Sequence, residues 1–159
     1  MCVQATQDAT DPALVDAVVA RQAVGVLLVA DNEAHSERLQ GMLAERGVRC
    51  GPLAVCGDRS VPVVVVTKKQ CRGYNQASRL GALVTGVYAG NAASRHQMVG
   101  RLRRTGQMRA EIEHVTVVMK GTLLQLLHEK QRWADTANIT LQSLGDKYGL
   151  EVLAGLAQA

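Results

Sequence analysis

The sequence predicts an α/β fold in which a mainly parallel central sheet has helices on both faces. Two runs, 24–30 (VGVLLVA) and 61–66 (VPVVVV), have the length of a strand and are apolar at every position. Such runs are typical of strands that are buried on both faces. Segments with helical periodicity alternate with the apolar runs, and this alternation favours parallel strands joined by crossover connections. The length of 159 residues suits one ordinary domain with a short appendage.

The first helix signal lies close to the N-terminus. Asp11 is a good N-cap residue, and Pro12 suits the first position of a helix. An apolar stripe follows them and predicts a short helix that ends near Gln22. We therefore expect residues 1–11 to form a flexible N-terminus.

A second helix follows the first apolar run. The spacing of Leu39 and Leu43 predicts a helix over 34–46 that stops at Gly47. The next elements are expected to be a short strand at 52–56 and the strand formed by the second apolar run.

The second half of the chain continues the alternation. Its expected elements are strands over 82–88 and 113–119 and helices over 92–103 and from 122 past 133. Thr122 and Gln125 have the spacing of a capping box at the start of the last of these helices. We expect one domain over 12–137, followed by a helical appendage over 138–159.

Composition excludes several classes of function. There is no Phe and only 3% of residues are aromatic, which argues against nucleic-acid binding by base stacking. The apolar runs are too short to cross a bilayer, so we expect no membrane partner. The N-terminus has no secretory signal pattern, which predicts an intracellular protein of the cytoplasm or nucleus. The four cysteines and four histidines show no zinc-binding spacing, so no metal ligand is assigned.

Positive charge is concentrated in two polar segments. Residues 95–109 contain five arginines and no acid, and residues 67–75 contain three basic residues and no acid, which leaves a net charge of −4 on the rest of the chain. The polar segments 67–76 and 89–107, which hold most of this charge, follow predicted strands, where functional loops of open parallel sheets lie. Arg101 and Arg104 are three residues apart, so on a helix they would share one face and suit an anion such as phosphate. A solvated basic helix end has the same pattern.

The segment 97–107 carries a longer pattern, Q-x-x-G-R-x-x-R-x-G-Q. It resembles motif VI of superfamily-two helicases and translocases, most closely the form found in Swi/Snf-type ATPases and related viral helicases. The matching residues are Gln97, Gly100, Arg101, Arg104, Gly106 and Gln107.

The segment 67–75 is similar to motif V of the same family. It begins with Thr67 at the end of an apolar strand, and Gly73 and Asn75 follow in the loop. Gln70 and Cys71 stand where the family commonly has a glycine pair. The resemblance covers about 12–135 in the family's order, ending with a K-G-T segment after the last strand, although the connection at 48–60 is shorter than usual.

The resemblance implies the three-layer, RecA-like C-terminal domain of a helicase or translocase. ATP with Mg²⁺ would be bound mainly by a first RecA-like domain, which this chain lacks because it has neither a Walker A nor a Walker B motif. The chain alone is therefore not expected to turn over ATP. Arg101 and Arg104 would be catalytic arginine fingers that reach the γ-phosphate across a cleft.

The resemblance also implies roles for the remaining motif residues. Nucleic-acid backbone contacts would come from Thr67, Lys68, Lys69 and Arg72. Residues at or near the nucleotide cleft would be Gly73, Asn75, Gln97, Gly100 and Gln107. The expected partners are nucleic acid, with DNA favoured over RNA, and a first RecA-like domain in the same chain or in another.

A second interpretation is a non-catalytic nucleic-acid-binding or structural module derived from such a domain. The short connection before the motif V-like segment and the altered loop within it favour this alternative. The presence of both Arg101 and Arg104 favours the motor domain, because a scaffold does not need both. For Lys68, Lys69 and Arg103, ordinary surface charge explains the sequence equally well.

Overall fold

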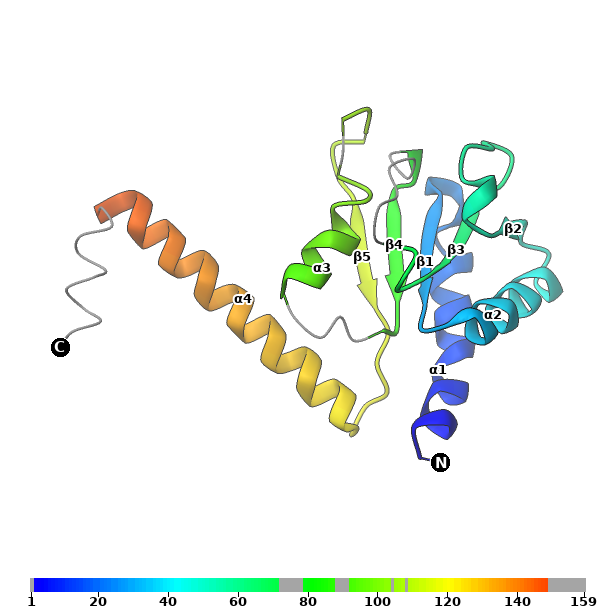
Figure 1. The fold of residues 1–159 in the computed structure, drawn as a ribbon, viewed down its shortest axis with the longest axis horizontal. Helices are drawn as coiled ribbons and strands as arrows, with labels where there is room; N and C mark the ends of the chain where they lie inside the picture. Colours follow the sequence, from blue (N-terminus) through cyan, green and yellow to red (C-terminus); the bar gives the residue numbers. More distant parts are fainter. Residues whose placement is uncertain (1, 72–78, 88–91, 104, 108, 149–159) are drawn as a thin grey trace. The chain divides into compact units, whose positions relative to one another are not determined.

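The computed structural model describes residues 2–71, 79–87, 92–103, 105–107 and 109–148 (Figure 1). The chain divides into two compact units, residues 1–120 and residues 121–159. The domain boundary predicted after residue 137 falls inside the long helix of the second unit.

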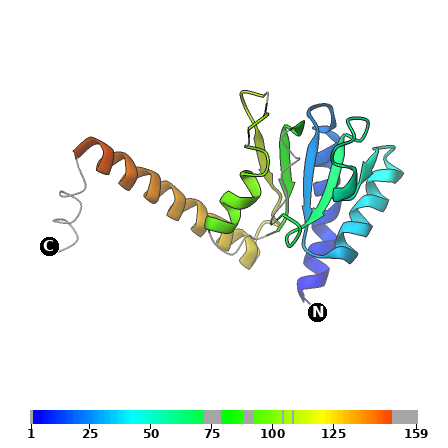
Figure 2. The ribbon, with the colours of Figure 1, turned by 45° about the horizontal axis from the view of Figure 1, so that its top comes forward.

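The first unit is built on a five-stranded sheet in which every described pairing is parallel. Its spatial order is β2-β3-β1-β4-β5, and Figure 2 shows the strands side by side. The strands are β1 (Val26–Ala30), β2 (Cys50–Gly51), β3 (Val63–Thr67), β4 (Ala82–Thr85) and β5 (Glu113–Thr116). The α/β class with a parallel sheet, predicted from the alternation of elements, is confirmed.

The three central strands are buried at every position, which explains why their sequences are apolar throughout. Neighbouring residues of a strand point to opposite faces of the sheet. In β1, Leu28 therefore joins one hydrophobic cluster and Leu27 joins the other. Burial on both faces requires a layer of other elements on each side of the sheet.

The helices supply those two layers (Figures 1 and 2). Helices α1 (Cys2–Val19) and α2 (Glu33–Glu45) cover one face, to which they contribute Leu14 and Leu39. Helix α3 (Ala92–Val99) covers the other face through Met98, and Leu102 packs there just beyond the helix end. The predicted three-layer arrangement is thus confirmed.

Two predictions for the first half of the chain are wrong. Helix α1 begins at Cys2 and contains Pro12, so Asp11 is not an N-cap. Instead, Asp11 is 2% exposed and its carboxylate is bound by Arg38 and His35 of α2. The strand predicted at 52–56 is a 3₁₀ turn, η2 (Leu53–Val55), because Pro52 has no N–H to extend the ladder from β2.

Several predicted elements end earlier than expected. Strand β4 stops at Thr85, whose side-chain oxygen accepts a hydrogen bond from the Val87 N–H at 2.9 Å and turns the chain. Strand β5 stops at Thr116 and helix α3 at Val99.

The second unit contains one long helix, α4 (Leu123–Tyr148). The Gln125 N–H donates to Thr122 Oγ1 at 3.3 Å, as the capping-box spacing predicts, while Gln125 Oε1 accepts from the Gly121 N–H at 2.7 Å. The helical segment expected after residue 148 lies outside the described residues. Within the described part of the chain, no helix is both long enough and apolar enough to cross a membrane.

Candidate nucleic-acid and nucleotide interface

The chain makes a compact turn directly after β3, in the motif V-like segment. Thr67 is buried, its N–H donates to Gln70 Oε1 at 2.9 Å, and its Oγ1 accepts from the Gln70 N–H at 3.3 Å. The Cys71 N–H donates to the Thr67 carbonyl at 3.1 Å. The N–H, the Oγ1 and the carbonyl of Thr67 all form hydrogen bonds within this turn, so the turn has a defined shape.

Gln70 and Cys71, which replace the family's usual glycine pair, both have structural contacts. Gln70 Nε2 donates to Glu33 Oε1 at 3.3 Å and so connects the turn to the start of α2. Cys71 is 4% exposed and belongs to the hydrophobic cluster on the α3 side of the sheet. The loop is thus attached to the core through Cys71 and to the exposed start of α2 through Gln70.

The basic residues of this turn lie at the edge of the sheet where the parallel strands end. The Lys68 N–H donates to the Ala30 carbonyl at 2.9 Å, so its backbone continues the pairing of β3 with β1. Lys68 is half-buried and Lys69 is exposed. The predicted residues Arg72, Gly73 and Asn75 lie outside the described residues.

Gly100 marks the end of helix α3 in the motif VI-like segment. Its N–H donates to the His96 carbonyl at 2.8 Å, and a Cβ at this position would lie only 2.8 Å from the same oxygen. This close approach to the backbone favours glycine at position 100, and it explains the glycine in the motif VI-like pattern. Gln97, on the helix itself, is exposed.

Arg101 lies in the turn beyond the helix rather than on it. Its N–H donates to the Met98 carbonyl at 3.2 Å, and the residue is only 8% exposed. The prediction of a helix through 103 is wrong, because the helix ends two residues before Arg101. The shared face of Arg101 and Arg104 stays a prediction. Arg104 lies outside the described residues.

The two motif-like segments share one part of the hydrophobic core, because Cys71 lies in the same cluster as Met98 and Leu102. Burial raises the pKa of the Cys71 thiol to about 11, and the positive charge of Arg101 opposes that rise. Cys71 is four residues beyond Thr67 in the turn after β3. The fold therefore brings the segment that contains Arg101 to the cluster below the motif V-like turn, although 30 residues separate Cys71 from Arg101.

Gln107 uses its side-chain amide to hold the loop before β5. Its Nε2 donates to the carbonyls of Leu80 at 3.0 Å and Leu102 at 3.1 Å, and its Oε1 accepts from the Arg109 N–H at 3.1 Å. These bonds fasten the motif VI-like segment to the chain that enters β4.

We expect Gln107→Ala to lower the free energy of unfolding by about 2 kcal/mol, because three backbone groups lose a partner. The measurement is urea unfolding followed by circular dichroism. Thr105→Ala is the control, since Thr105 is an exposed residue of the same loop. Equal stabilities of the Gln107 variant and the control would show that the three bonds do not hold the loop.

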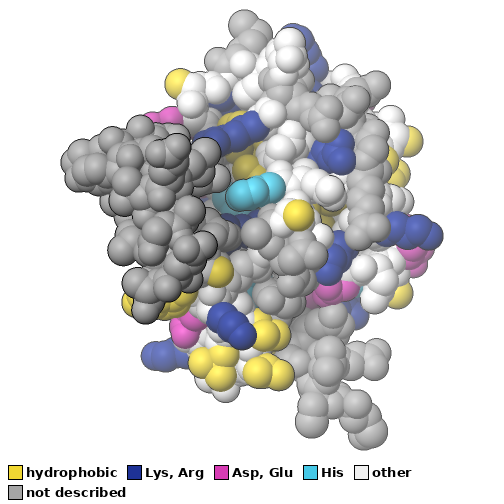
Figure 3. Space-filling model, turned by 60° about the vertical axis from the view of Figure 1, so that its left-hand side comes forward, with side chains coloured by type: hydrophobic (Ala, Val, Ile, Leu, Met, Phe, Trp, Pro, Cys, Tyr) yellow, Lys and Arg dark blue, Asp and Glu magenta, His cyan; other side chains and the backbone are white. Residues whose placement is uncertain are grey.

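Figure 3 shows how charge is distributed over one face of the molecule. Lys and Arg side chains recur across this face but stand apart from one another, with apolar and acidic side chains between them. Within the described ranges, no three or more His, Cys, Asp or Glu side chains gather where they could hold a metal ion.

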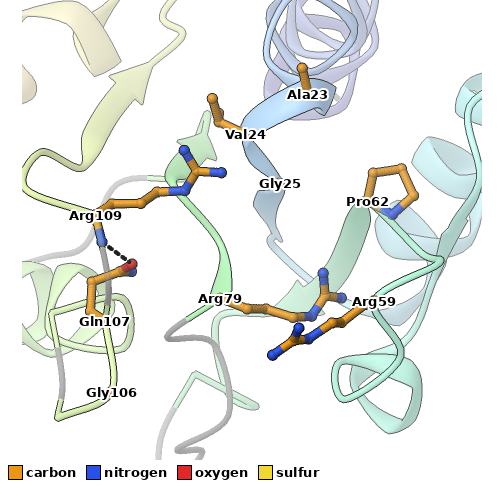
Figure 4. A pocket seen from close by; sticks show the side chains of 9 residues that line it. All are labelled: Ala23, Val24, Gly25, Arg59, Pro62, Arg79, Gly106, Gln107 and Arg109. Carbon is orange, nitrogen blue, oxygen red and sulfur yellow. Dashed lines mark hydrogen bonds between the residues drawn. The ribbon is translucent and has the colours of Figure 1, made fainter.

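Two features were missed by the sequence reasoning. One is the buried group formed by Asp11, His35 and Arg38 between α1 and α2. The other is a pocket at the edge where the strands begin, lined by Arg59, Arg79 and Arg109 (Figure 4). A usable signal for the pocket was present, because each of these arginines stands a few residues before a strand.

Comparison with known proteins shows likeness at the level of structure. No protein-family model and no curated protein sequence matches the chain. The structure is similar to the C-terminal part of the Fun30 ATPase domain, with a TM-score of 0.63 and 16% identity over 78% of this chain and 44% of that one. It is also similar to a DEAD box protein from the hyperthermophile Methanococcus jannaschii, with a TM-score of 0.63 and 14% identity over 83% of this chain and 37% of that one.

The chain spans less than half the length of either structure. At these sequence identities the likeness establishes the fold. The parallel sheet with helices on both faces is a three-layer, RecA-like α/β domain of the kind found in these two proteins.

Proposed function

We propose that this chain is the second, C-terminal motor domain of an ATP-dependent nucleic-acid helicase or translocase. It would work with a first RecA-like domain, in the same chain or in another, inside the cytoplasm or nucleus. Arg101 and Arg104 would act as arginine fingers, and the turn after β3 would contact the nucleic-acid backbone. The likeness of the fold to the Fun30 ATPase fragment and the DEAD box protein supports the domain type.

The shared packing of the two motif-like segments carries this proposal. Leu102, the residue after Arg101, belongs to the same hydrophobic cluster as Cys71, and Cys71 ends the turn that begins at Thr67. A domain that couples hydrolysis to movement needs its phosphate-sensing arginine connected to its nucleic-acid loop. In the proposed domain, this cluster would supply the connection.

Among the described residues, arginine side chains suit the phosphate groups of ATP-Mg²⁺, whereas no group of side chains suits its metal ion. Guanidinium groups match phosphate oxygens in geometry and charge. Among these residues, acids and other metal ligands do not cluster in threes. When bound, ATP supplies the phosphoryl group whose transfer drives the cycle. In the proposed arrangement, this chain's arginines would stabilise charge on that group, while Mg²⁺ would be held by the first domain.

Lys68 and Lys69 provide the test of the nucleic-acid contact. We expect Lys68→Ala with Lys69→Ala to weaken oligonucleotide binding about tenfold and to reduce the slope of log Kd against log salt by about 2, because two phosphate contacts are lost. Fluorescence anisotropy with labelled DNA and RNA strands measures both quantities and shows which nucleic acid is preferred.

The matched control for charge is Lys130→Ala with Arg132→Ala, two exposed residues of α4. This variant also loses two positive charges and should keep the salt slope of the wild type. An unchanged slope in the Lys68 and Lys69 variant would remove the turn after β3 from the nucleic-acid interface.

The function as a whole is tested by ATP hydrolysis. The chain alone is expected to be inactive, and mixing or fusing it with a domain that carries the Walker motifs should give hydrolysis stimulated by nucleic acid. If nucleic acid binds but no stimulation follows, the chain is not a motor domain.

One observation favours the non-catalytic alternative. Arg101 is 8% exposed, whereas an arginine finger must reach a nucleotide held by another domain. In a binding module, Arg101 would instead serve to fix the turn after β3. The hydrolysis measurement separates the two functions. A binding module would bind nucleic acid but would give no stimulated ATP hydrolysis when it is combined with a Walker-motif domain.

A further inference from the structure

A pocket of about 500 Å³ opens at the edge of the sheet where the parallel strands begin. Its lining includes Gly25 before β1, Pro62 before β3 and Arg79 before β4, together with Gln107 and Arg109 before β5. The turn that contains Lys68 and Lys69 follows the end of β3, so it lies at the opposite edge. Gly106 and Gln107 of the lining belong to the motif VI-like pattern, but the motor function proposed above assigns no role to Arg59, Arg79 or Arg109.

Three arginines from three different loops line the pocket. Figure 4 shows Arg59, Arg79 and Arg109 around it. Guanidinium groups gathered around one pocket repel each other, and an anion bound among them lowers that repulsion. The described lining residues include no acid.

Two of the arginines are held in place by the surrounding backbone. Arg79 donates through Nε to the Cys56 carbonyl and through Nη2 to the Val61 carbonyl at 2.8 Å. The stem of Arg109 lies against Gly81, where a Cβ would come within 2.8 Å of Arg109 Cδ. The site is therefore partly preorganised, which lowers the entropic cost of binding a ligand.

Asp58, the residue before Arg59, does not belong to the pocket lining. Its Oδ1 accepts from the Ser60 N–H at 2.8 Å. Hydrogen bonds from Ser60 are the main cause that lowers the pKa of Asp58, and the charges of Arg79 and Arg49 contribute less. Neither Arg59 nor Arg109 forms an ion pair with any described acid.

The basic surface continues beyond the pocket. A second hollow of about 360 Å³ shares Gln107 and Arg109 with it and adds Arg103 and Thr105. Arginines spaced along one edge suit a ligand with more than one negative group. Their planar, forked donors suit phosphate in particular, since phosphate accepts two parallel hydrogen bonds from one guanidinium.

We propose that the pocket lined by Arg59, Arg79 and Arg109 binds phosphate groups, supplied by a nucleic-acid backbone or by a free nucleotide. The proposal does not rest on the motor function, because none of these three arginines belongs to the motif V-like or motif VI-like pattern. Its ligand is defined by chemistry: at least two linked phosphates, of the size that a pocket of this volume admits.

The test uses pyrophosphate as the smallest probe, followed by two-dimensional ¹H–¹⁵N NMR of the full chain. Pyrophosphate should shift the backbone amide signals of Gly25, Gly106 and Gln107. Arg59→Ala with Arg109→Ala should weaken its binding about tenfold or more, since both side chains are exposed and their removal leaves the core intact. Arg132→Ala, an exposed arginine of α4, is the charge control and should bind as the wild type does.

Further arms identify the source of the phosphate. If a single-stranded oligonucleotide shifts the same signals and the double variant weakens its binding, the source is nucleic acid; if only pyrophosphate and ATP do so, it is a free nucleotide. The proposal is overturned if pyrophosphate shifts no pocket signal, if the control loses as much affinity as the double variant, or if a polyglutamate peptide competes equally well.

These arms also keep this site separate from the proposed motor function. Loss of the Lys68 and Lys69 side chains should leave pyrophosphate binding at the pocket unchanged. Conversely, an inactive ATPase would not affect the NMR result, so each proposal fails or stands by its own measurement.

Discussion

Asp11→Ala should lower the free energy of unfolding by about 3 kcal/mol, which corresponds to a fall in Tm of about 6–12 °C for a chain of this size. The Asp11 carboxylate accepts a hydrogen bond from Arg38 Nε at 2.6 Å and lies 3.0 Å from His35 Nε2. Asp11 and His35 are 2% and 4% exposed, so water cannot replace the lost bond to the imidazole. Thermal unfolding by circular dichroism or calorimetry measures the change.

Asp16→Ala is the matched control for this prediction. Asp16 also lies on α1 and forms an ion pair with Arg46, just beyond the end of α2, at 3.3 Å, but both side chains are more than half exposed. Exposed pairs of this kind contribute about 0–1 kcal/mol. A loss of stability in the Asp11 variant no larger than in the Asp16 variant would show that the buried group does not hold α1 to α2.

The same group makes stability depend on pH through His35. Burial lowers the pKa of His35, but the hydrogen bond with Asp31 and the charge and hydrogen bond of Asp11 outweigh it and raise the pKa above 6.5. The stabilising contribution is therefore fully present below pH 6.5 and is lost as the pH rises through the pKa of the folded state. Tm measured from pH 6 upward should fall over this range in the wild type and should change less in Asp11→Ala.

The central strands could be predicted from sequence because their burial on both faces leaves no polar position. Strand β1 (Val26–Ala30) lies within the run at 24–30, and β3 (Val63–Thr67) extends one residue beyond the run at 61–66. Their parallel pairing follows from the helical segment between them. Element ends were less predictable, because they depend on single contacts. Asp11 has the residue type of an N-cap, and only the distant partners on α2 explain why it lies inside a helix.

The candidate site was predictable in part for the same reason. The motif V-like and motif VI-like segments are local patterns, so the sequence could place Thr67, Lys68 and Arg101 in them. It could not show that the helix would end before Arg101, because the turn is set by Gly100 and by the packing of Leu102. The arginine pocket was missed because its residues are distant in sequence and become neighbours only when four strands begin at one edge.

Arg104→Ala should reduce nucleic-acid-stimulated ATP hydrolysis by about 10³-fold or more when the chain is combined with a Walker-motif domain. An arginine finger stabilises charge that develops only in the transition state, and its loss is worth 10³–10⁵ in kcat. kcat and kcat/KM for ATP should therefore fall together, whereas loss of a ground-state contact would raise KM alone. For Arg101, which is buried, Arg101→Lys is the variant to compare, because it keeps the charge beside Cys71 and removes the forked donor.

Arg103→Ala is the control for both changes. Arg103 lies in the same turn and is exposed, and its removal should leave hydrolysis within about twofold of the wild type. Circular dichroism of each variant separates a loss of catalysis from a loss of fold. If Arg101→Lys and Arg104→Ala both hydrolyse ATP at the rate of the Arg103 control, these arginines are not fingers. The buried Arg101 would then have a structural role alone.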